Sequence, residues 1–328
     1  MGRGQGDGWE PEGWRTGPEW DKRRSRRWLG PAAGVVAAVA TVLVMRPSLI
    51  TDRFPGAESP AAAEVTPLPA ETERPTEAPP RVDPDRPTRE DPFAGSPAKQ
   101  WADGAEGIEP PEAEAVGGLS AEQVAEGLEL AREFLIGTNL DPEVLAGAVP
   151  EDALTALDPM SVMGDFVADG LAEPSIEQNP VDVFTRINPE RAELLGEVVK
   201  VRGHMSVEAG EYGADIHADY TFVYPVVAVG GSDEVTRSVV RRTWVFTVPD
   251  PARTDATPHT LWPGLWMAER SNDSCEVTDG YLNPEFPSEW KPIPGSGVDP
   301  YDRSGSLEEE GGQEENGRAA SCSPLSRI

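Results

Sequence analysis

Two histidines in a stretch of alternating polar and apolar residues are the first candidates for chemistry in this chain. His204 and His217 lie on neighbouring predicted strands, and Asp215 and Asp219 flank the second histidine. Imidazole and carboxylate groups on one face could bind a metal ion or transfer protons. A metal site needs three or four converging ligands, whereas adjacent side chains on an exposed, twisted sheet face diverge. We therefore expect a solvated polar face without metal or cofactor, and a solvated His259 in its loop of Pro and Thr.

The pairing of these two strands decides which side chains meet. A two-residue hairpin turn at 210–211, which begins with Gly, predicts the pairing. It places Arg202 opposite Asp219 and His204 opposite His217. A slip of two residues would keep the same faces but would lose the attraction between Arg202 and Asp219.

Five aromatic residues recur at strand spacing and could line a small-ligand pocket. Such a stripe is more often part of a hydrophobic core, and both interpretations stay open. One of the strands also carries Arg242 on its otherwise apolar face. The five aromatic residues are Tyr220, Phe222, Tyr224, Trp244 and Phe246.

Composition and motifs exclude several classes of function. The chain has 28 Lys and Arg against 58 Asp and Glu, a net charge of −30, so nucleic acid is not expected as a partner. No HExxH, GxSxG, phosphate-binding GxxxxGK[ST] or dinucleotide-binding motif is present. We therefore predict no catalytic residues, no cofactor and no enzyme activity.

A segment without charge predicts a membrane anchor at 28–50. Residues 28–45 would span roughly 27 Å as a helix, close to the thickness of the hydrocarbon layer. Basic residues within 22–27 place the N-terminus in the cytoplasm and the remainder outside. A cleaved signal peptide, a twin-arginine signal and a buried core helix remain as alternatives. The expected localisation is the cell membrane, as a single-pass protein.

The 33 Gly and 34 Pro residues indicate that much of the chain does not form a core. We therefore expect one folded domain with disordered flanks. The predicted divisions are a cytoplasmic tail at 1–27, the transmembrane helix at 28–50, a disordered stalk rich in Pro and Glu at 51–118, an extracytoplasmic domain at 119–287 and a disordered acidic tail at 288–328.

The only two cysteines, Cys275 and Cys322, would both lie on the extracytoplasmic side. Oxidising conditions there favour a disulfide that joins the tail to the domain and contributes on the order of 2–4 kcal/mol. Two free thiols, or pairing between chains, are the alternatives.

Within 119–287, helical periodicity precedes strand periodicity. A capping box at Ser120 and Gln123 starts a helix through 137, and short helices follow near 141–145, 150–157 and 161–169. Alternating strands are predicted near 199–207, 216–224, 235–248 and 265–277. This order predicts an α+β fold class, with short helices packed on a curved antiparallel sheet of about four strands.

Several sequence strings carry a resemblance to a known group of proteins. They are Asn-Leu-Asp-Pro at 139–142, Val-Lys-Val-Arg-Gly at 199–203, Asp-Tyr-Thr-Phe-Val-Tyr at 219–224, and Cys275 with Asp-Gly-Tyr at 279–281. Together they resemble actinobacterial single-pass membrane proteins of uncharacterised function, over roughly residues 119–287. The order of elements is similar to the NTF2-like cone. The resemblance implies no known activity and no catalytic residues.

The function expected from these observations is that of a membrane-anchored extracytoplasmic interaction or assembly module of the cell envelope. Its partners would be the membrane, through one spanning helix, and a protein of the envelope. A small-ligand-binding NTF2-like domain and an envelope hydrolase are the alternatives.

Overall fold

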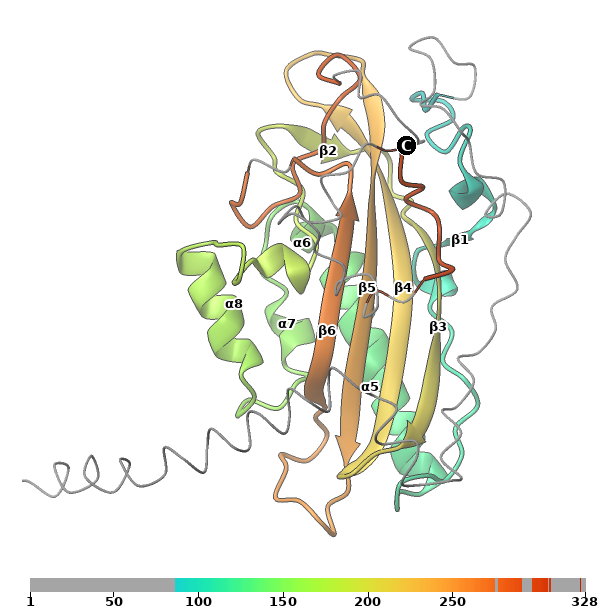
Figure 1. The fold of residues 1–328 in the computed structure, drawn as a ribbon, viewed down its shortest axis with the longest axis vertical. Coiled ribbons are helices and arrows are strands. Elements are labelled where there is room, and N and C mark those ends of the chain that lie inside the picture. The colour runs from blue at the N-terminus through green and yellow to red at the C-terminus, as the bar shows by residue number, and fades with distance from the viewer. Residues whose placement is uncertain (1–85, 275–276, 291–296, 306, 308–324, 326–328) are drawn as a thin grey trace, which may run out of the picture. The chain divides into compact units, whose positions relative to one another are not determined.

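The computed structural model describes residues 86–274, 277–290, 297–305, 307 and 325 (Figure 1). These residues belong to one compact unit of the chain, Ala62–Ile328. The other unit, Met1–Ala61, lies outside the described residues.

An antiparallel sheet of six strands forms the centre of the described unit (Figure 1). The strand order is β1-β3-β4-β5-β6, and β2 pairs with one end of β4. Long runs of Val, Thr and aromatic residues favour these extended strands. The strands are β1 at Ala102–Asp103, β2 at Ala192–Leu194, β3 at Lys200–Ala209, β4 at Gly213–Ala228, β5 at Val235–Pro249 and β6 at Trp262–Ser271.

One long helix, α5 at Ala121–Asn139, packs on the inner face of the sheet. The predicted capping box is confirmed. The Ser120 hydroxyl oxygen accepts a hydrogen bond from the backbone N–H of Gln123, and the side-chain oxygen of Gln123 accepts one from the backbone N–H of Ser120. The remaining helices are α6 at Pro142–Leu145, α7 at Glu151–Leu154, α8 at Met163–Ala172, and the 3-10 turns η2 at Pro97–Gln100, η3 at Gly104–Gly107 and η4 at Pro180–Asp182.

The main core lies between α5 and the inner face of the sheet. The apolar residues predicted from helical spacing, Val124, Leu128, Ala131 and Leu135, are all buried there. Gly203 on β3 faces Tyr220 on β4, and a Cβ at Gly203 would lie 2.2 Å from the tyrosine ring. A glycine at this position therefore lets the ring lie across β3.

The predicted fold class is wrong and is corrected here. In place of about four strands with short helices and a transmembrane helix, the described chain forms a mostly antiparallel sheet of six strands with few helices. The strands β1 and β2 have two and three residues, too few for alternation to reveal them. The last predicted strand also ends early, at Ser271, because Asn272 takes a positive φ of 59°.

The described fold starts before the predicted domain boundary at 119 and continues beyond 287. Residues 86–118, assigned above to the stalk, contain β1, which pairs with β3. Residues 297–305, assigned to the acidic tail, include the fully buried Tyr301. Both segments pack on the sheet, as described below.

The expected membrane localisation is also corrected. Among the described residues, no helix is long and apolar enough to cross a membrane. The segment 28–50, on which the single-pass prediction rested, lies outside the described residues. We therefore do not retain the single-pass architecture or the topology derived from it.

Candidate protein-interaction face

The outer face of the sheet, opposite α5, divides into two halves. The upper part, from Asp219 to Val227 on β4, is overlaid by residues 86–101 and 299–305, and we call it the covered half. We call the rest the open half. It is formed by Ser206, Glu208, Asp215, His217, Val245, Thr247, Trp262, Leu265 and Met267.

An apolar cluster holds the two overlying segments on the covered half. Phe93, Trp101 and Tyr301 pack there against Val223 and Val239. The rings of Trp101 and Tyr301 meet edge to face, with their centroids 5.9 Å apart. This cluster forms a second, smaller core on the outer side of the sheet.

A buried ion cluster closes the lower edge of the covered half. Arg241 on β5 donates two hydrogen bonds to the Asp219 carboxylate, at 3.1 and 2.8 Å. Arg303, from the C-terminal segment, lies 3.1 Å from the same carboxylate and also donates to Thr221 Oγ1. Arg241 in turn donates to the Gly305 carbonyl oxygen at 2.9 Å. Asp219 therefore connects two strands with the segment that covers them.

The ionisation of this cluster follows from its burial and its charges. Burial alone would raise the pKa of Asp219, but the Arg241 hydrogen bonds and the nearby Arg303 charge outweigh burial and lower it. Burial lowers the pKa of His204, and the positive charges of Arg303 and Arg241 add to that effect while Asp219 opposes it. The Nδ1 atom of His204 is buried and has no hydrogen-bond partner among the described residues.

The predicted hairpin register is wrong by two residues. Arg202 lies opposite Thr221, and His204 lies opposite Asp219, so the two histidines are not paired. The predicted turn at 210–211 is displaced because Gly210 and Gly213 close the hairpin, with the Gly210 amide donating to the Gly213 carbonyl oxygen. Asp219 pairs instead with Arg241 on β5, a strand that the prediction from β3 and β4 alone did not include.

The predicted polar face is present, but its groups do not converge on a ligand. His217 Nε2 lies 2.9 Å from Glu208 Oε1, and Thr247 donates to Asp215 at 2.6 Å. Ser206 is the Cα partner of His217, yet no hydrogen bond joins their side chains within the described chain. No group of three or more His, Cys, Asp or Glu residues that could hold a metal was found in the same part of the chain. His259 is exposed and contacts Glu126.

The open half exposes large apolar side chains beside these polar groups. Leu265 is 52% exposed and Tyr212, in the hairpin turn, is 47% exposed. The ring of Tyr212 lies 5.8 Å from the ring of Trp262. Apolar side chains gathered on an exposed sheet face, with carboxylates at the rim, are typical of a protein-binding surface.

The strand β6 is an edge of the sheet next to the open half. Among the described strands it pairs only with β5. Leu157 forms a parallel bridge with Leu261 just before β6 starts.

The aromatic stripe on the inner face is part of the core. Tyr220, Phe222, Tyr224, Trp244 and Phe246 are all fully buried. Phe134 of α5 contacts Trp244 and Phe246, with centroids 5.0 and 5.3 Å away. These contacts support the core interpretation of the stripe over the pocket interpretation.

Arg242, the charged residue on an otherwise apolar strand face, has buried partners that the sequence did not predict. The residue is fully buried, and its Nε donates to Asn139 Oδ1 at 2.7 Å. Its second amino group donates to the Val181 carbonyl oxygen and to Thr185 Oγ1. Burial lowers the pKa of Arg242 to about 10, so the guanidinium stays charged at neutral pH. A charged residue in an apolar strand pattern was the only sequence signal of this network.

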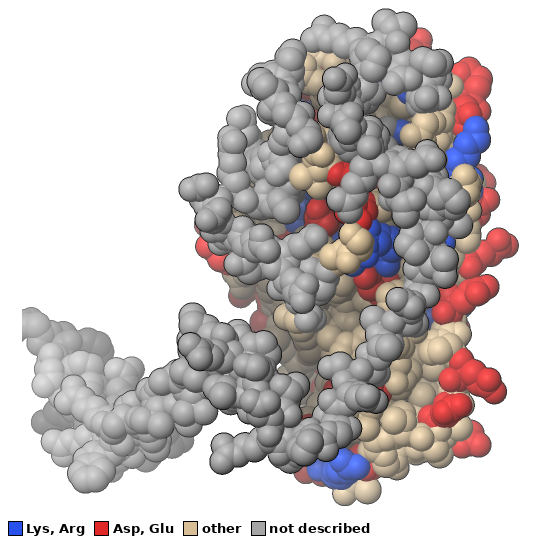
Figure 2. Space-filling model, turned by 45° about the vertical axis from the view of Figure 1, so that its right-hand side comes forward, with Lys and Arg blue, Asp and Glu red and all other residues tan. Residues whose placement is uncertain are grey.

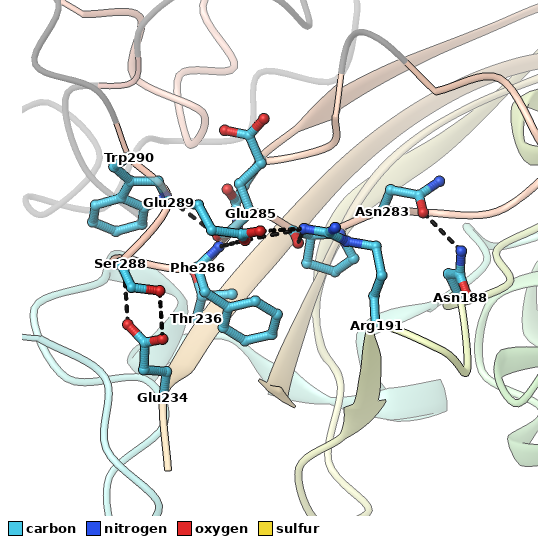
Figure 3. A network of polar contacts seen from close by, with 12 residues as sticks. Asn188, Arg191, Glu234, Thr236, Asn283, Glu285, Phe286, Ser288, Glu289 and Trp290 are labelled. Atoms are coloured by element: carbon cyan, nitrogen blue, oxygen red, sulfur yellow. Dashed lines mark hydrogen bonds and ion pairs between the residues drawn. The ribbon is translucent and has the colours of Figure 1, made fainter. Parts of the chain in front are cut away.

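The segment 277–290 after β6 is held by polar contacts that are satisfied within the fold (Figure 3). Arg191 donates to Glu289 at 3.0 Å and to the Pro284 carbonyl oxygen at 3.1 Å. Other contacts join Asn188 to Asn283 and Ser288 to Glu234. Because these groups bind one another, they serve the fold and are not available to a ligand.

The distribution of charge leaves the surface strongly acidic. Arg186, Arg237, Arg241 and Arg242 are all buried. Carboxylates gather along one side of the molecule, with few Lys or Arg among them (Figure 2). A shallow groove of about 720 Å³ is lined in part by Glu106, but its Arg132 already donates to Ile108 and Glu129. We find no unpartnered group there that points to a ligand.

The predicted disulfide stays a prediction, because Cys275 and Cys322 lie outside the described residues. No known protein family, curated protein or solved structure matches the chain.

Proposed function

We propose that this protein is an interaction module whose open half binds a basic and apolar segment of another protein. The observation that carries the proposal is the contrast within one sheet face. The chain covers the upper part with its own segments, and it leaves Leu265 in the lower part and Tyr212 in the adjoining turn exposed. Exposed apolar side chains lower the solubility of a protein, and a bound partner that covered them would remove this effect.

Charge favours a basic partner over a second copy of the chain. Glu208 and Asp215 lie on the open half, and Glu211 is exposed in the turn beside it. The whole chain carries −30, so two copies would repel each other at this surface. A partner with Lys or Arg between apolar residues would satisfy both kinds of group.

Site-specific photo-cross-linking tests the proposal in cells that make the full chain. A benzophenone amino acid is placed at Leu265 and, as a control, at Ile176, which is apolar and 84% exposed but lies outside the open half. We expect cross-links to a defined protein from position 265 and none to that protein from position 176.

Reconstitution then separates binding from chance capture. A synthetic peptide spanning the cross-linked segment should bind the purified full chain, and Val245→Glu should weaken that binding at least tenfold. Equal binding to the wild-type chain and to Val245→Glu would overturn the proposal, as would identical cross-links from both positions.

A further inference from the structure

We propose that residues 299–305, which we call the strap, are released from the covered half when His204 takes up a proton. This proposal concerns the covered half and does not depend on the role proposed for the open half. Release of the strap would uncover Val223 and Val239, so the apolar part of the outer face would grow at mildly acidic pH.

The strap contacts the covered half through an aromatic ring and a cation. Tyr301 packs in the apolar cluster against the ring of Trp101, with the centroids 5.9 Å apart. Arg303 lies 3.1 Å from the Asp219 carboxylate, and it donates to the Asp219 carbonyl oxygen at 3.1 Å and to Thr221 Oγ1. Because the Arg303 contact is electrostatic, a change of charge beside Asp219 would alter this attachment of the strap.

His204 lies beside this ion cluster. On β3 it is the Cα partner of Asp219. Asp219 already interacts with two cations, one from β5 and one from the strap, which are Arg241 and Arg303. Arg202 lies two residues away from His204 on the same face of β3. A proton on His204 would therefore add a further cation around one carboxylate.

Other charged groups on this face have partners of their own. His217 on β4 lies 2.9 Å from Glu208, and Asp302 of the strap accepts from a backbone amide at 3.0 Å. Asp219 is the carboxylate that lies directly opposite His204 in the strand pairing. The balance between this anion and the cations around it therefore sets the cost of a proton on His204.

The neutral form of His204 suits the seated strap. An imidazolium has two N–H donors, but the Nδ1 atom of His204 is buried and has no hydrogen-bond partner among the described residues. Burial lowers the pKa of His204, and the charges of Arg303 and Arg241 add to this effect while Asp219 opposes it. Release of the strap would remove Arg303 and admit water to the imidazole. Since the seated state binds this proton more weakly, protonation favours the released state.

The lowered pKa also sets the direction of the pH dependence. Above roughly 6.5, the ordinary pKa of histidine, His204 is neutral in both states and the strap stays seated. Below that pH the released state binds more protons, and its population grows as the pH falls through the pKa of the seated state. Asp219 stays ionised near pH 5 despite its burial, because Arg241 and Arg303 lower its pKa.

Amide hydrogen exchange of the full chain measures release of the strap. Protection factors for 299–305 are compared at pH 7.5 and pH 5, which removes the intrinsic pH dependence of exchange. We expect protection of the strap to fall at least fivefold in the wild type and less than twofold in His204→Gln. His217→Gln, the matched histidine variant on the same face, should behave like the wild type.

Helix α5 is the reference for global unfolding in the same experiment, and it should stay more strongly protected than the strap at both pH values. Equal falls in strap protection for the wild type and His204→Gln would overturn the proposal. Equal protection of the strap and α5 at both pH values would also overturn it, because the strap would then open only when the whole chain unfolds.

An NMR titration tests the same coupling from the other side, without changing His204. Tyr301→Ala leaves every charge of the ion cluster in place but weakens the apolar attachment of the strap. We therefore expect the pKa of His204 to rise toward its ordinary value in this variant, and Tyr301→Leu is the milder replacement if Tyr301→Ala does not fold. A His204 pKa that is the same in the wild type and in the folded variant would overturn the proposal.

Discussion

The covered half and the open half of the outer face belong to the same sheet but are completed in different ways. In the covered half, Phe93, Trp101 and Tyr301 bury the strands, and Asp219 is paired with two arginines. In the open half, Leu265 is exposed, and His217 and Glu208 meet each other at a half-exposed site. Side chains of similar kind are therefore buried by the chain's own segments in one half and left exposed in the other.

The largest expected effect comes from removing the carboxylate of the covered half. Asp219→Ala removes the buried carboxylate that Arg241 and Arg303 share, which should destabilise the chain by about 3–5 kcal/mol. Denaturant unfolding of the full chain measures this loss. The matched change in the open half, Asp215→Ala, should cost no more than about 1 kcal/mol. Similar losses for the two variants would contradict the distinction between the halves.

The apolar cluster of the covered half should show the next largest effect. Tyr301→Ala removes a fully buried ring that packs on Trp101, and we expect a loss of about 2–4 kcal/mol. Tyr212→Ala, in the turn beside the open half, removes a ring of the same size that is 47% exposed. Its expected cost is below about 1 kcal/mol, measured by the same unfolding experiment. If Tyr301→Ala were as mild, the overlying segment would not contribute to stability.

The sequence predicted the long elements well because periodicity is strongest there. The start of α5 and the alternation along β3, β4 and β5 are all observed. The short strands β1 and β2 and the overlying segments 86–101 and 299–305 were missed. They are held by contacts with distant parts of the chain, such as Arg237 with the Ala94 carbonyl oxygen, and such contacts have no local sequence signal.

The candidate site was predictable only in part for the same reason. Alternation correctly placed His204, His217 and Asp219 on one face. The register failed because a two-strand argument assigned Asp219 to Arg202, while the third strand supplied Arg241. Which half of that face would be covered could not be read from composition, since the covering segment at 299–305 lies in a stretch that reads as an acidic tail.

The pH dependence of stability tests the contribution of His204, which lies opposite Asp219 in the covered half. Its pKa is lowered in the fold, mainly by burial, so the unfolded chain binds more protons as the pH falls past about 6.5. Stability from this residue is therefore present above that pH and declines below it. Wild type should lose more stability between pH 7.5 and 5 than His204→Gln does. His217→Gln is the control that keeps the His204 contribution. Parallel curves for wild type and His204→Gln would refute this assignment.

The smallest expected effect on stability comes from the open half itself. Leu265→Lys replaces an exposed apolar side chain with a charged one, and the free energy of unfolding should change by less than about 0.5 kcal/mol. A loss of 2 kcal/mol or more, on the scale of about 2–5 for truncating a buried core side chain, would show that Leu265 supports the fold.

Binding to that same variant tests the central claim most directly. The Kd of the cross-linked partner segment is measured for the wild-type chain and for Leu265→Lys under identical salt. Because the substitution removes an apolar contact and adds a repelling cation, we predict a Kd at least tenfold higher for Leu265→Lys. An unchanged Kd would contradict the assignment of the open half as the interaction surface.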